Sequence, residues 1–181
     1  MIKYSQQYID EEDIAAVTEV LKSELITQGN VVREFEYSVS GYVGAKYGVA
    51  ANSATSALHV ALVSMGVGKG DWVWTSPNTF VATANAVLMS GARVDFVDID
   101  LTTYNISTEA LREKLETAKR RACIPKVVIA VDFAGLPCDY EALKTLSEKY
   151  NFKILSDSSH ALGARYKGIE IGHAQHSDVC V

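Results

Sequence analysis

Residues 154–163 read Ile154-Leu155-Ser156-Asp157-Ser158-Ser159-His160-Ala161-Leu162-Gly163. The apolar start of this stretch predicts a buried strand, and Asp157 and His160 come at its carboxyl end. Open α/β sheets bind their ligands at that edge. Asp157 there either caps neighbouring backbone or pairs with the protonated ring nitrogen of a cofactor such as pyridoxal phosphate. His160 either forms a local hydrogen bond or orients a cofactor or substrate group.

Strand and helix patterns alternate over most of the chain. We expect strands over residues 47–51, 72–75, 93–99, 127–133 and 152–156, helices over 55–65 and 79–89, and helices capped at Ser107 and Asp139. Strands that alternate with helices pair in parallel through right-handed crossovers. A short hairpin is expected over 163–172, and a further strand from 177 reaches Val181. The sequence therefore predicts an α/β fold with a mostly parallel sheet, flanking helices and an incomplete last strand.

The first 44 residues have a different pattern. Asp10 is a helix cap, and the following helix carries Ile14, Val17 and Leu21 on one face. A second helical pattern ends near Gly44. We therefore expect an N-terminal helical segment over 1–44 and an α/β core over 45–181.

Composition excludes several classes of function. The chain has 181 residues, 48% of them hydrophobic, which is enough for a buried core. Its net charge of −5 offers no basic face for nucleic acid, and it has no apolar run of about 18 residues that could span a membrane. The polar N-terminus lacks a signal peptide pattern, so a cytoplasmic protein is expected. His173 and His176 lack a carboxylate at a fitting spacing, so no metal site is expected.

Two further segments follow strand patterns and belong to the same expected edge. Residues 52–58 put small and hydroxyl side chains at a helix start, which suits a phosphate but equally suits an ordinary Ser/Thr cap. Phe80 begins the next helix, where its ring either stacks on a flat heteroaromatic group or is buried in the core.

Five motifs together resemble a known family. They are Thr27-Gln28-Gly29, Asn52-Ser53-Ala54-Thr55-Ser56-Ala57-Leu58, Phe80-Val81-Ala82-Thr83-Ala84-Asn85, Val131-Asp132-Phe133-Ala134-Gly135 and Ser156-Asp157-Ser158-Ser159-His160-Ala161-Leu162-Gly163. In order and spacing they resemble the DegT/DnrJ/EryC1/StrS nucleotide-sugar aminotransferases. Within that family the likeness is greatest to members that aminate carbon 4 of a UDP-linked sugar in pseudaminic acid biosynthesis. The resemblance implies the aspartate aminotransferase-like large domain (fold type I) and the cofactor pyridoxal 5'-phosphate.

The resemblance also implies roles for individual residues. Ala54 and Thr55 would hold the cofactor phosphate, and Phe80 would stack on the pyridine ring. Asp157 would pair with the ring nitrogen and hold it protonated, since neighbouring opposite charges favour each other's charged forms. His160 would contact the region of the ring's 3-oxygen.

The substrate side is implied by the same resemblance. Tyr4, Leu25, Ile26, Thr27 and Gln28 would line the nucleotide-sugar site, across the interface of a homodimer. The expected reaction moves an amino group from an amino acid, L-glutamate, to C4 of a UDP-4-keto-6-deoxy-N-acetylhexosamine. Another nucleotide-sugar 3- or 4-aminotransferase, or a catalytically inert fold fragment, is the alternative.

The lysine that binds the cofactor covalently in this family would come at or beyond Val181. Lys153 begins the strand before Asp157 and Lys167 lies in the expected hairpin turn, so neither matches that lysine. We therefore expect residues 1–181 to be the N-terminal part of the cofactor domain, without the smaller C-terminal domain. By itself this chain is predicted to be inactive.

Overall fold

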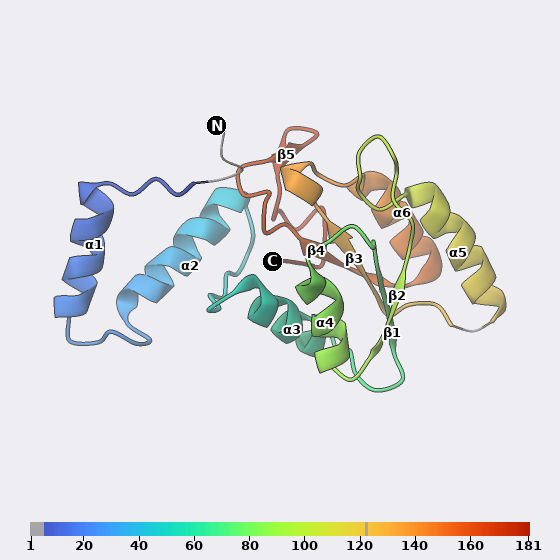
Figure 1. Ribbon diagram of the computed structural model, residues 1–181, viewed down its shortest axis with the longest axis horizontal. Coiled ribbons are helices and arrows are strands. Elements are labelled where there is room, and N and C mark those ends of the chain that lie inside the picture. Colours follow the sequence, from blue (N-terminus) through green and yellow to red (C-terminus); the bar gives the residue numbers. More distant parts are fainter. Residues whose placement is uncertain (1–5, 122) are drawn as a thin grey trace.

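The computed structural model describes residues 6–121 and 123–181. At its centre lies a five-stranded sheet in the order β2-β1-β3-β4-β7, in which each neighbouring pair is parallel (Figure 1). Its strands are β1 (Trp72–Thr75), β2 (Arg93–Phe96), β3 (Val127–Val131), β4 (Lys153–Asp157) and β7 (Val179–Cys180). The predicted α/β class and parallel sheet are confirmed.

Helices cover both faces of this sheet. They are α3 (Ala54–Ser64) and α4 (Val81–Met89) on one face, and α5 (Thr108–Arg120) and α6 (Tyr140–Tyr150) on the other (Figure 1). Alternate residues of β3 serve the two cores, because side chains along a strand point to opposite faces. Val127 and Ile129 pack with α3 and α4, whereas Val128 and Ala130 pack with α5 and α6. Apolar burial on both faces fixes the register of the central strands.

The expected hairpin follows β4. Its strands β5 (Arg165–Tyr166) and β6 (Ile169–Glu170) pair antiparallel. Lys167 and Gly168 both have positive φ, at 51° and 85°, as the two central residues of a type I′ hairpin turn require. A short 3₁₀ turn, η1 (Phe133–Gly135), follows β3.

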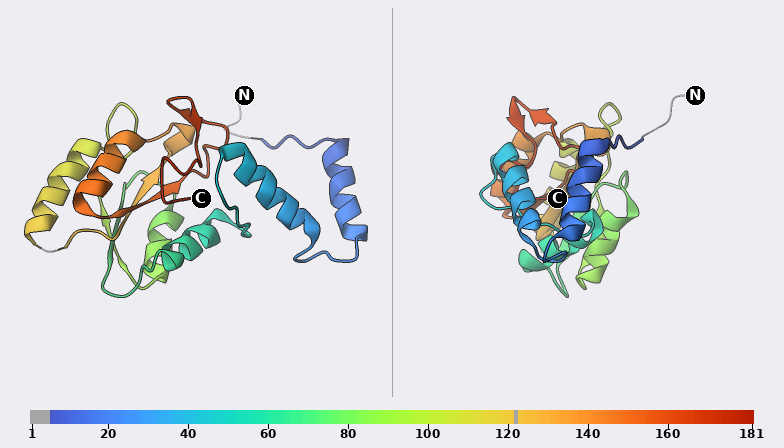
Figure 2. Two further views of the ribbon diagram at one scale, coloured as in Figure 1. Left: turned by 180° about the vertical axis from the view of Figure 1, so that it is seen from behind. Right: turned by 90° about the vertical axis from the view of Figure 1, so that its left-hand side faces the viewer.

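The N-terminal helices project away from the sheet. α1 (Glu11–Lys22) begins with a capping box between Asp10 and Asp13, and it has no buried residue. α2 (Asn30–Val43) ends at Gly44, whose φ of 69° is the left-handed conformation typical of a helix end. α1 lies at the far end of the molecule from the sheet (Figure 1 and the left view of Figure 2). Among residues 6–121 and 123–181, none of the helices combines the length and apolar character needed to cross a membrane.

Three strand predictions need correction. Residues 47–51 form no strand, because this segment runs beside α2, where the Ala50 amide donates to the Glu36 carboxylate at 2.8 Å. A strand needs a neighbouring strand for its hydrogen bonds, and the described chain places none there. The predicted 93–99 strand stops at Phe96, and the 127–133 strand stops at Val131, where the chain turns into η1.

Candidate cofactor site

The carboxyl ends of the strands and the start of α4 meet at one edge of the sheet. α4 follows β1 through a short connection, so its first turn lies at this edge. A side-chain contact confirms the placement, because Thr83 in that first turn donates a hydrogen bond to Asp157 at the end of β4. Ligand sites of open α/β sheets occur at this edge.

Asp157 is the buried acid of this edge. Its exposed fraction is 7%. The Thr83 hydroxyl donates to one carboxylate oxygen at 2.7 Å, and the Ser159 hydroxyl donates to the other at 2.7 Å. Thr79 lies behind Thr83, with 2.7 Å between their hydroxyl oxygens. These contacts hold the carboxylate in one orientation and leave each oxygen a further lone pair for another donor.

The start of α3 presents backbone amides. The Ser53 hydroxyl accepts from the Ser56 amide at 3.2 Å and thereby caps the helix. Ala54 and Thr55 precede that capped amide, and the first amides of a helix have no partner within the helix. Together with the helix dipole, these amides suit an anion such as phosphate.

Phe80 and His160 are both exposed. Phe80 immediately precedes α4 and is 74% exposed, so the structure excludes the alternative that its ring is a core residue. His160 lies in the turn that follows β4. An aromatic ring of such exposure at a ligand edge is available for stacking.

The expected substrate residues lie elsewhere in the chain. Leu25, Ile26, Thr27 and Gln28 are exposed in the connection between α1 and α2. Figure 1 and the left view of Figure 2 place that connection at the end of the molecule away from the sheet, so this chain does not bring it to the carboxyl end of β4. Tyr4 lies outside the described residues.

A second buried acid, Asp132, follows β3 and is only 2% exposed. It accepts hydrogen bonds from the Cys138 amide, the Tyr140 hydroxyl and the Ser158 hydroxyl. Burial raises the pKa of the Asp132 carboxyl, and the hydrogen bonds from Ser158, Cys138 and Tyr140 only partly offset this. The same burial raises the pKa of the Tyr140 hydroxyl, which therefore stays protonated and donates.

Sequence reasoning assigned no role to Thr83, Ser159 or Asp132. Thr83 lies within a helix pattern and Ser159 within a turn pattern, and neither pattern indicates that the side chain binds a buried carboxylate. Asp132 did carry a signal, because it ends an apolar strand in the same way as Asp157 does. An acid after a fully buried strand needs hydrogen-bond partners, so the sequence indicates a bound carboxylate at Asp132 as much as at Asp157.

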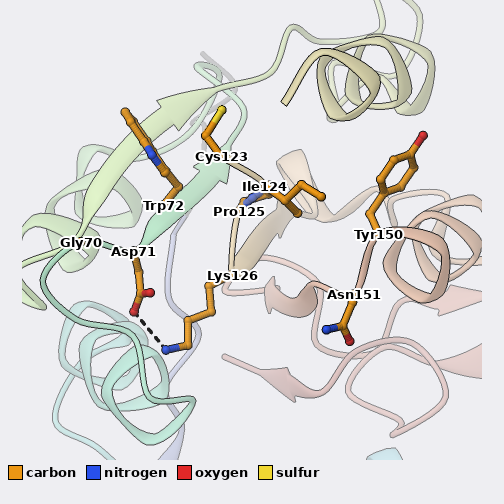
Figure 3. A pocket seen from close by; sticks show the side chains of 9 residues that line it. All are labelled: Gly70, Asp71, Trp72, Cys123, Ile124, Pro125, Lys126, Tyr150 and Asn151. Carbon is orange, nitrogen blue, oxygen red and sulfur yellow. Dashed lines mark hydrogen bonds and ion pairs between the residues drawn. The ribbon is translucent and has the colours of Figure 1, made fainter. Parts of the chain in front are cut away.

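A pocket lies at the opposite edge of the sheet. It is lined by Gly70, Asp71, Trp72, Cys123, Ile124, Pro125, Lys126, Tyr150 and Asn151 (Figure 3). Lys126 and Asp71 form an ion pair there at 3.0 Å, and the hydrogen bond from Lys126 lowers the pKa of the Asp71 carboxyl. Because these residues adjoin the amino ends of β1 and β3, the pocket is separate from the Asp157 edge.

The residues of the Asp157 edge and the start of α3 together offer the groups that pyridoxal phosphate requires. The group needs an anion for its ring nitrogen, a flat partner for its ring and amide donors for its phosphate. A buried carboxylate with spare lone pairs, an exposed phenyl ring and the start of α3 supply these three properties.

Similar solved structures define the class of protein. The fold matches the Helicobacter pylori PseC aminotransferase of pseudaminic acid biosynthesis with a TM-score of 0.85 and 36% identity, over 94% of this chain and 44% of that one. It matches the Streptococcus pneumoniae putative sugar aminotransferase Spr1654 with a TM-score of 0.86 and 31% identity, over 99% and 47%. One Spr1654 structure is a pyridoxal phosphate form. The chain therefore has the fold of the pyridoxal phosphate aminotransferases.

The chain belongs to the DegT/DnrJ/EryC1/StrS aminotransferase family, whose model matches residues 7–180. It is 44% identical over 172 residues to the Campylobacter jejuni UDP-4-amino-4,6-dideoxy-N-acetyl-beta-L-altrosamine transaminase, which is 95% of this chain and 44% of that protein. It is 40% identical to the Bacillus subtilis spore coat polysaccharide biosynthesis protein SpsC, over 94% of this chain and 42% of that one. The chain thus spans less than half the length of these relatives.

Proposed function

We propose that the protein carrying this chain is a pyridoxal phosphate-dependent aminotransferase for a nucleotide sugar. The observation that carries the proposal is the buried, doubly hydrogen-bonded Asp157 carboxylate at the carboxyl edge of the sheet. Membership of the aminotransferase family supports the same reaction class.

Each residue of the site would make a distinct contribution. Asp157 would hold a proton on the cofactor's ring nitrogen, because a buried anion favours the charged form of its partner. Phe80 would fix the plane of the ring, and Ala54 and Thr55 would bind the phosphate through amide and hydroxyl groups. His160 would donate to the 3-oxygen. When bound, the cofactor supplies the carbonyl that accepts the amino group and a ring that withdraws electrons.

The proposed amino acceptor is a UDP-linked 4-keto-6-deoxy-N-acetylhexosamine, and the proposed donor is L-glutamate. The likeness to the C. jejuni altrosamine transaminase and to H. pylori PseC supports the sugar and a role in pseudaminic acid or related cell-surface sugar biosynthesis. The likeness to SpsC leaves another nucleotide-sugar aminotransferase as the second candidate.

The proposal includes the setting of the enzyme. Residues 1–181 would form the N-terminal part of a cofactor-binding large domain, with 1–44 as its helical segment and 45–181 as its core. The protein would be a cytoplasmic homodimer in which Tyr4 and residues 25–28 of one subunit complete the sugar site of the other. The exposure of residues 25–28, away from Asp157 of the same chain, supports this arrangement.

The test uses the protein expressed from its complete gene. Purified protein is incubated with pyridoxal phosphate, L-glutamate and a panel of UDP- and dTDP-linked keto sugars, and amino sugar is measured by mass spectrometry. The expected product is the 4-amino sugar from the UDP-linked substrate. Amination at carbon 3, or of the dTDP sugar alone, would overturn the substrate assignment, and failure to bind pyridoxal phosphate would overturn the class.

A variant at Asp157 tests the role of the carboxylate. Asp157→Asn should lower turnover by about 10- to 100-fold, because a charge-assisted hydrogen bond is worth about 1.5–3 kcal/mol and each 1.4 kcal/mol is a factor of ten. Glu113→Gln, which neutralises an exposed acid on α5, is the matched control and should leave turnover unchanged. Equal turnover in the Asp157 and Glu113 variants would contradict the assigned role.

A further inference from the structure

The Asp132 carboxylate is bound by neutral donors alone. The Cys138 amide donates to one oxygen at 2.8 Å, and the hydroxyls of Tyr140 and Ser158 lie 2.8 and 2.6 Å from the other. Within residues 6–121 and 123–181 no lysine or arginine forms an ion pair with it. A buried acid without a cation is costly, so its retention calls for a reason beyond packing.

The protons of this cluster can be assigned. An ionised carboxylate only accepts hydrogen bonds, so Tyr140 and Ser158 each direct their single hydroxyl proton at Asp132. The Ser156 hydroxyl lies against Tyr140, 2.5 Å from the Ser158 oxygen and 3.4 Å from the Asp132 carboxylate, so its proton has three acceptors within reach. The hydroxyls of Tyr140 and Ser158 are thus both directed at Asp132, which ties these two side chains to the carboxylate.

This cluster is joined to the turn that carries Asp157 and His160. The Asp132 amide donates to the Asp157 carbonyl at 3.0 Å, and the Asp132 carboxylate accepts from the Ser158 hydroxyl one residue further on. Gly135 then lies so close to the His160 carbonyl that a Cβ at position 135 would approach its oxygen to 2.8 Å. Three successive contacts from the end of β3 therefore define the path of residues 157–160.

The register of the sheet explains why Asp132 holds this position. Val131 pairs with Asp157 in the parallel β3–β4 ladder, so the next residue of each strand, Asp132 and Ser158, come opposite each other. Ser158 points its side chain into the cluster, whereas Asp157 and Ser159, on either side of it, bond to each other at the ligand edge. Fixing Ser158 therefore fixes the direction of the Asp157 side chain.

We propose that Asp132 is a positioning residue, whose carboxylate holds Ser158 and thereby sets the orientation of Asp157 and His160 toward the cofactor ring. The inference deepens the proposed function and rests on it for the identity of the cofactor. Asp132 touches neither cofactor nor substrate in this assignment. A core acid that only stabilised the domain would affect all parts of the fold alike, whereas a positioning residue acts on the turn.

The first experiment needs no cofactor. Hydrogen exchange is measured by mass spectrometry on the cofactor-free protein from the complete gene, and on its Asp132→Asn and Ser158→Ala variants. In the wild type, the Ser158 amide donates to the Val181 carbonyl and the Ala161 amide to the Ser158 carbonyl, so both report on the turn. We expect exchange of peptides covering 157–161 to accelerate at least tenfold in both variants, with peptides of α5 unchanged.

The second experiment measures the cofactor. The dissociation constant of pyridoxal phosphate is determined by equilibrium dialysis, and ¹⁵N-labelled cofactor reports by NMR whether its ring nitrogen is protonated. Both variants should weaken binding about tenfold and shift the nitrogen resonance toward the unprotonated value. Ile129→Val removes a buried methylene from β3 in the core on the other face of the sheet, which contains none of the cluster residues, and serves as the stability control, with no expected change in either signal.

The outcomes separate the two proposals. If wild-type protein fails to bind pyridoxal phosphate, the proposed function is wrong, and hydrogen exchange of the turn still decides whether Asp132 positions it. Wild-type binding together with unchanged exchange and an unchanged nitrogen signal in both variants would overturn the positioning role. Ser158→Ala keeps the Asp132 bonds to Cys138 and Tyr140, so it remains informative if Asp132→Asn does not fold.

Discussion

At the end of β4, the Asp157 carboxylate depends on hydroxyl donors from two different segments. Ser159 belongs to its own turn, whereas Thr83 comes from α4, 74 residues earlier in the chain. The Thr83 bond therefore links the position of the acid to the helix that begins beside Phe80. This long-range hydrogen bond, together with the packing of α4 on the sheet, therefore holds the acid for the ring nitrogen near the aromatic ring for its face.

The matched substitutions at Thr83 test this link. Thr83→Val keeps the shape but leaves a buried carboxylate oxygen without its donor, which should lower the free energy of unfolding by about 1.5–3 kcal/mol. Thr83→Ser keeps the hydroxyl and should lose less than half as much. Urea denaturation followed by circular dichroism measures both. A loss in Thr83→Val that is no larger than the loss in Thr83→Ser would contradict the assigned role of the hydrogen bond, because only the valine variant removes the donor.

Among the elements, those specified by local signals were predictable. Asp10, Ser107 and Asp139 were predicted caps, and each helix begins at the next residue with the cap side chain accepting from its first turn. A cap side chain binds an amide only two or three residues further along the chain, so the local sequence is enough to predict it. The 47–51 strand was wrong because strand formation depends on a partner, and its backbone meets Glu36 of α2 instead.

In the candidate site, too, the features that depend on local sequence were predictable and those that depend on tertiary packing were not. Asp157 and Phe80 were predicted from their places after strand patterns, and the structure brings their segments to one edge of the sheet. The contact of Asp132 with Ser158 follows from the β3–β4 register, which depends on the tertiary packing of both sheet faces. Local patterns contain no register, so this part of the site needed the structure.

The segment between the hairpin and β7 carries an element-scale prediction about pH. His176 packs between the rings of Tyr140 and Tyr166, at 5.2 and 5.6 Å between centroids. It is only 5% exposed, and its Nε2 atom has no hydrogen-bond partner among the described residues. Burial lowers the pKa of this imidazole, and the neighbouring His173 adds to that effect, while Asp132 and a backbone hydrogen bond at Ile169 oppose it.

The sign of the effect follows from proton linkage. Below the ordinary histidine pKa of about 6.5, His176 binds a proton in the unfolded chain more readily than in the folded protein, so stability falls as pH decreases from about 7 to 5. His176→Phe should flatten this part of the stability curve, measured by thermal unfolding at a series of pH values. His59→Gln, on α3 at the other face of the sheet, is the control. A wild-type curve that does not fall below pH 6.5 would refute the buried neutral state.

At the scale of the whole molecule, the sheet and its four covering helices form one body, and α1 extends from it (Figure 2). The apolar face of α1, formed by Ile14, Val17 and Leu21, is exposed throughout. An amphipathic helix gains little stability unless that face is covered, because isolated helices of this length are marginal in water. In the proposed homodimer the second subunit would supply the cover.

Charge placed on this face should therefore weaken the dimer. Leu21→Lys removes burial of one leucine in each subunit and adds two charges to the interface, so the dimer dissociation constant should rise at least tenfold, measured by sedimentation equilibrium on protein from the complete gene. Leu101→Lys is the matched control, since Leu101 is 81% exposed in the loop after β2, away from α1. Its dimer should dissociate as the wild type does. A monomeric wild type would contradict the proposed homodimer, and equal weakening by both substitutions would show that charge, and not the α1 face, controls association.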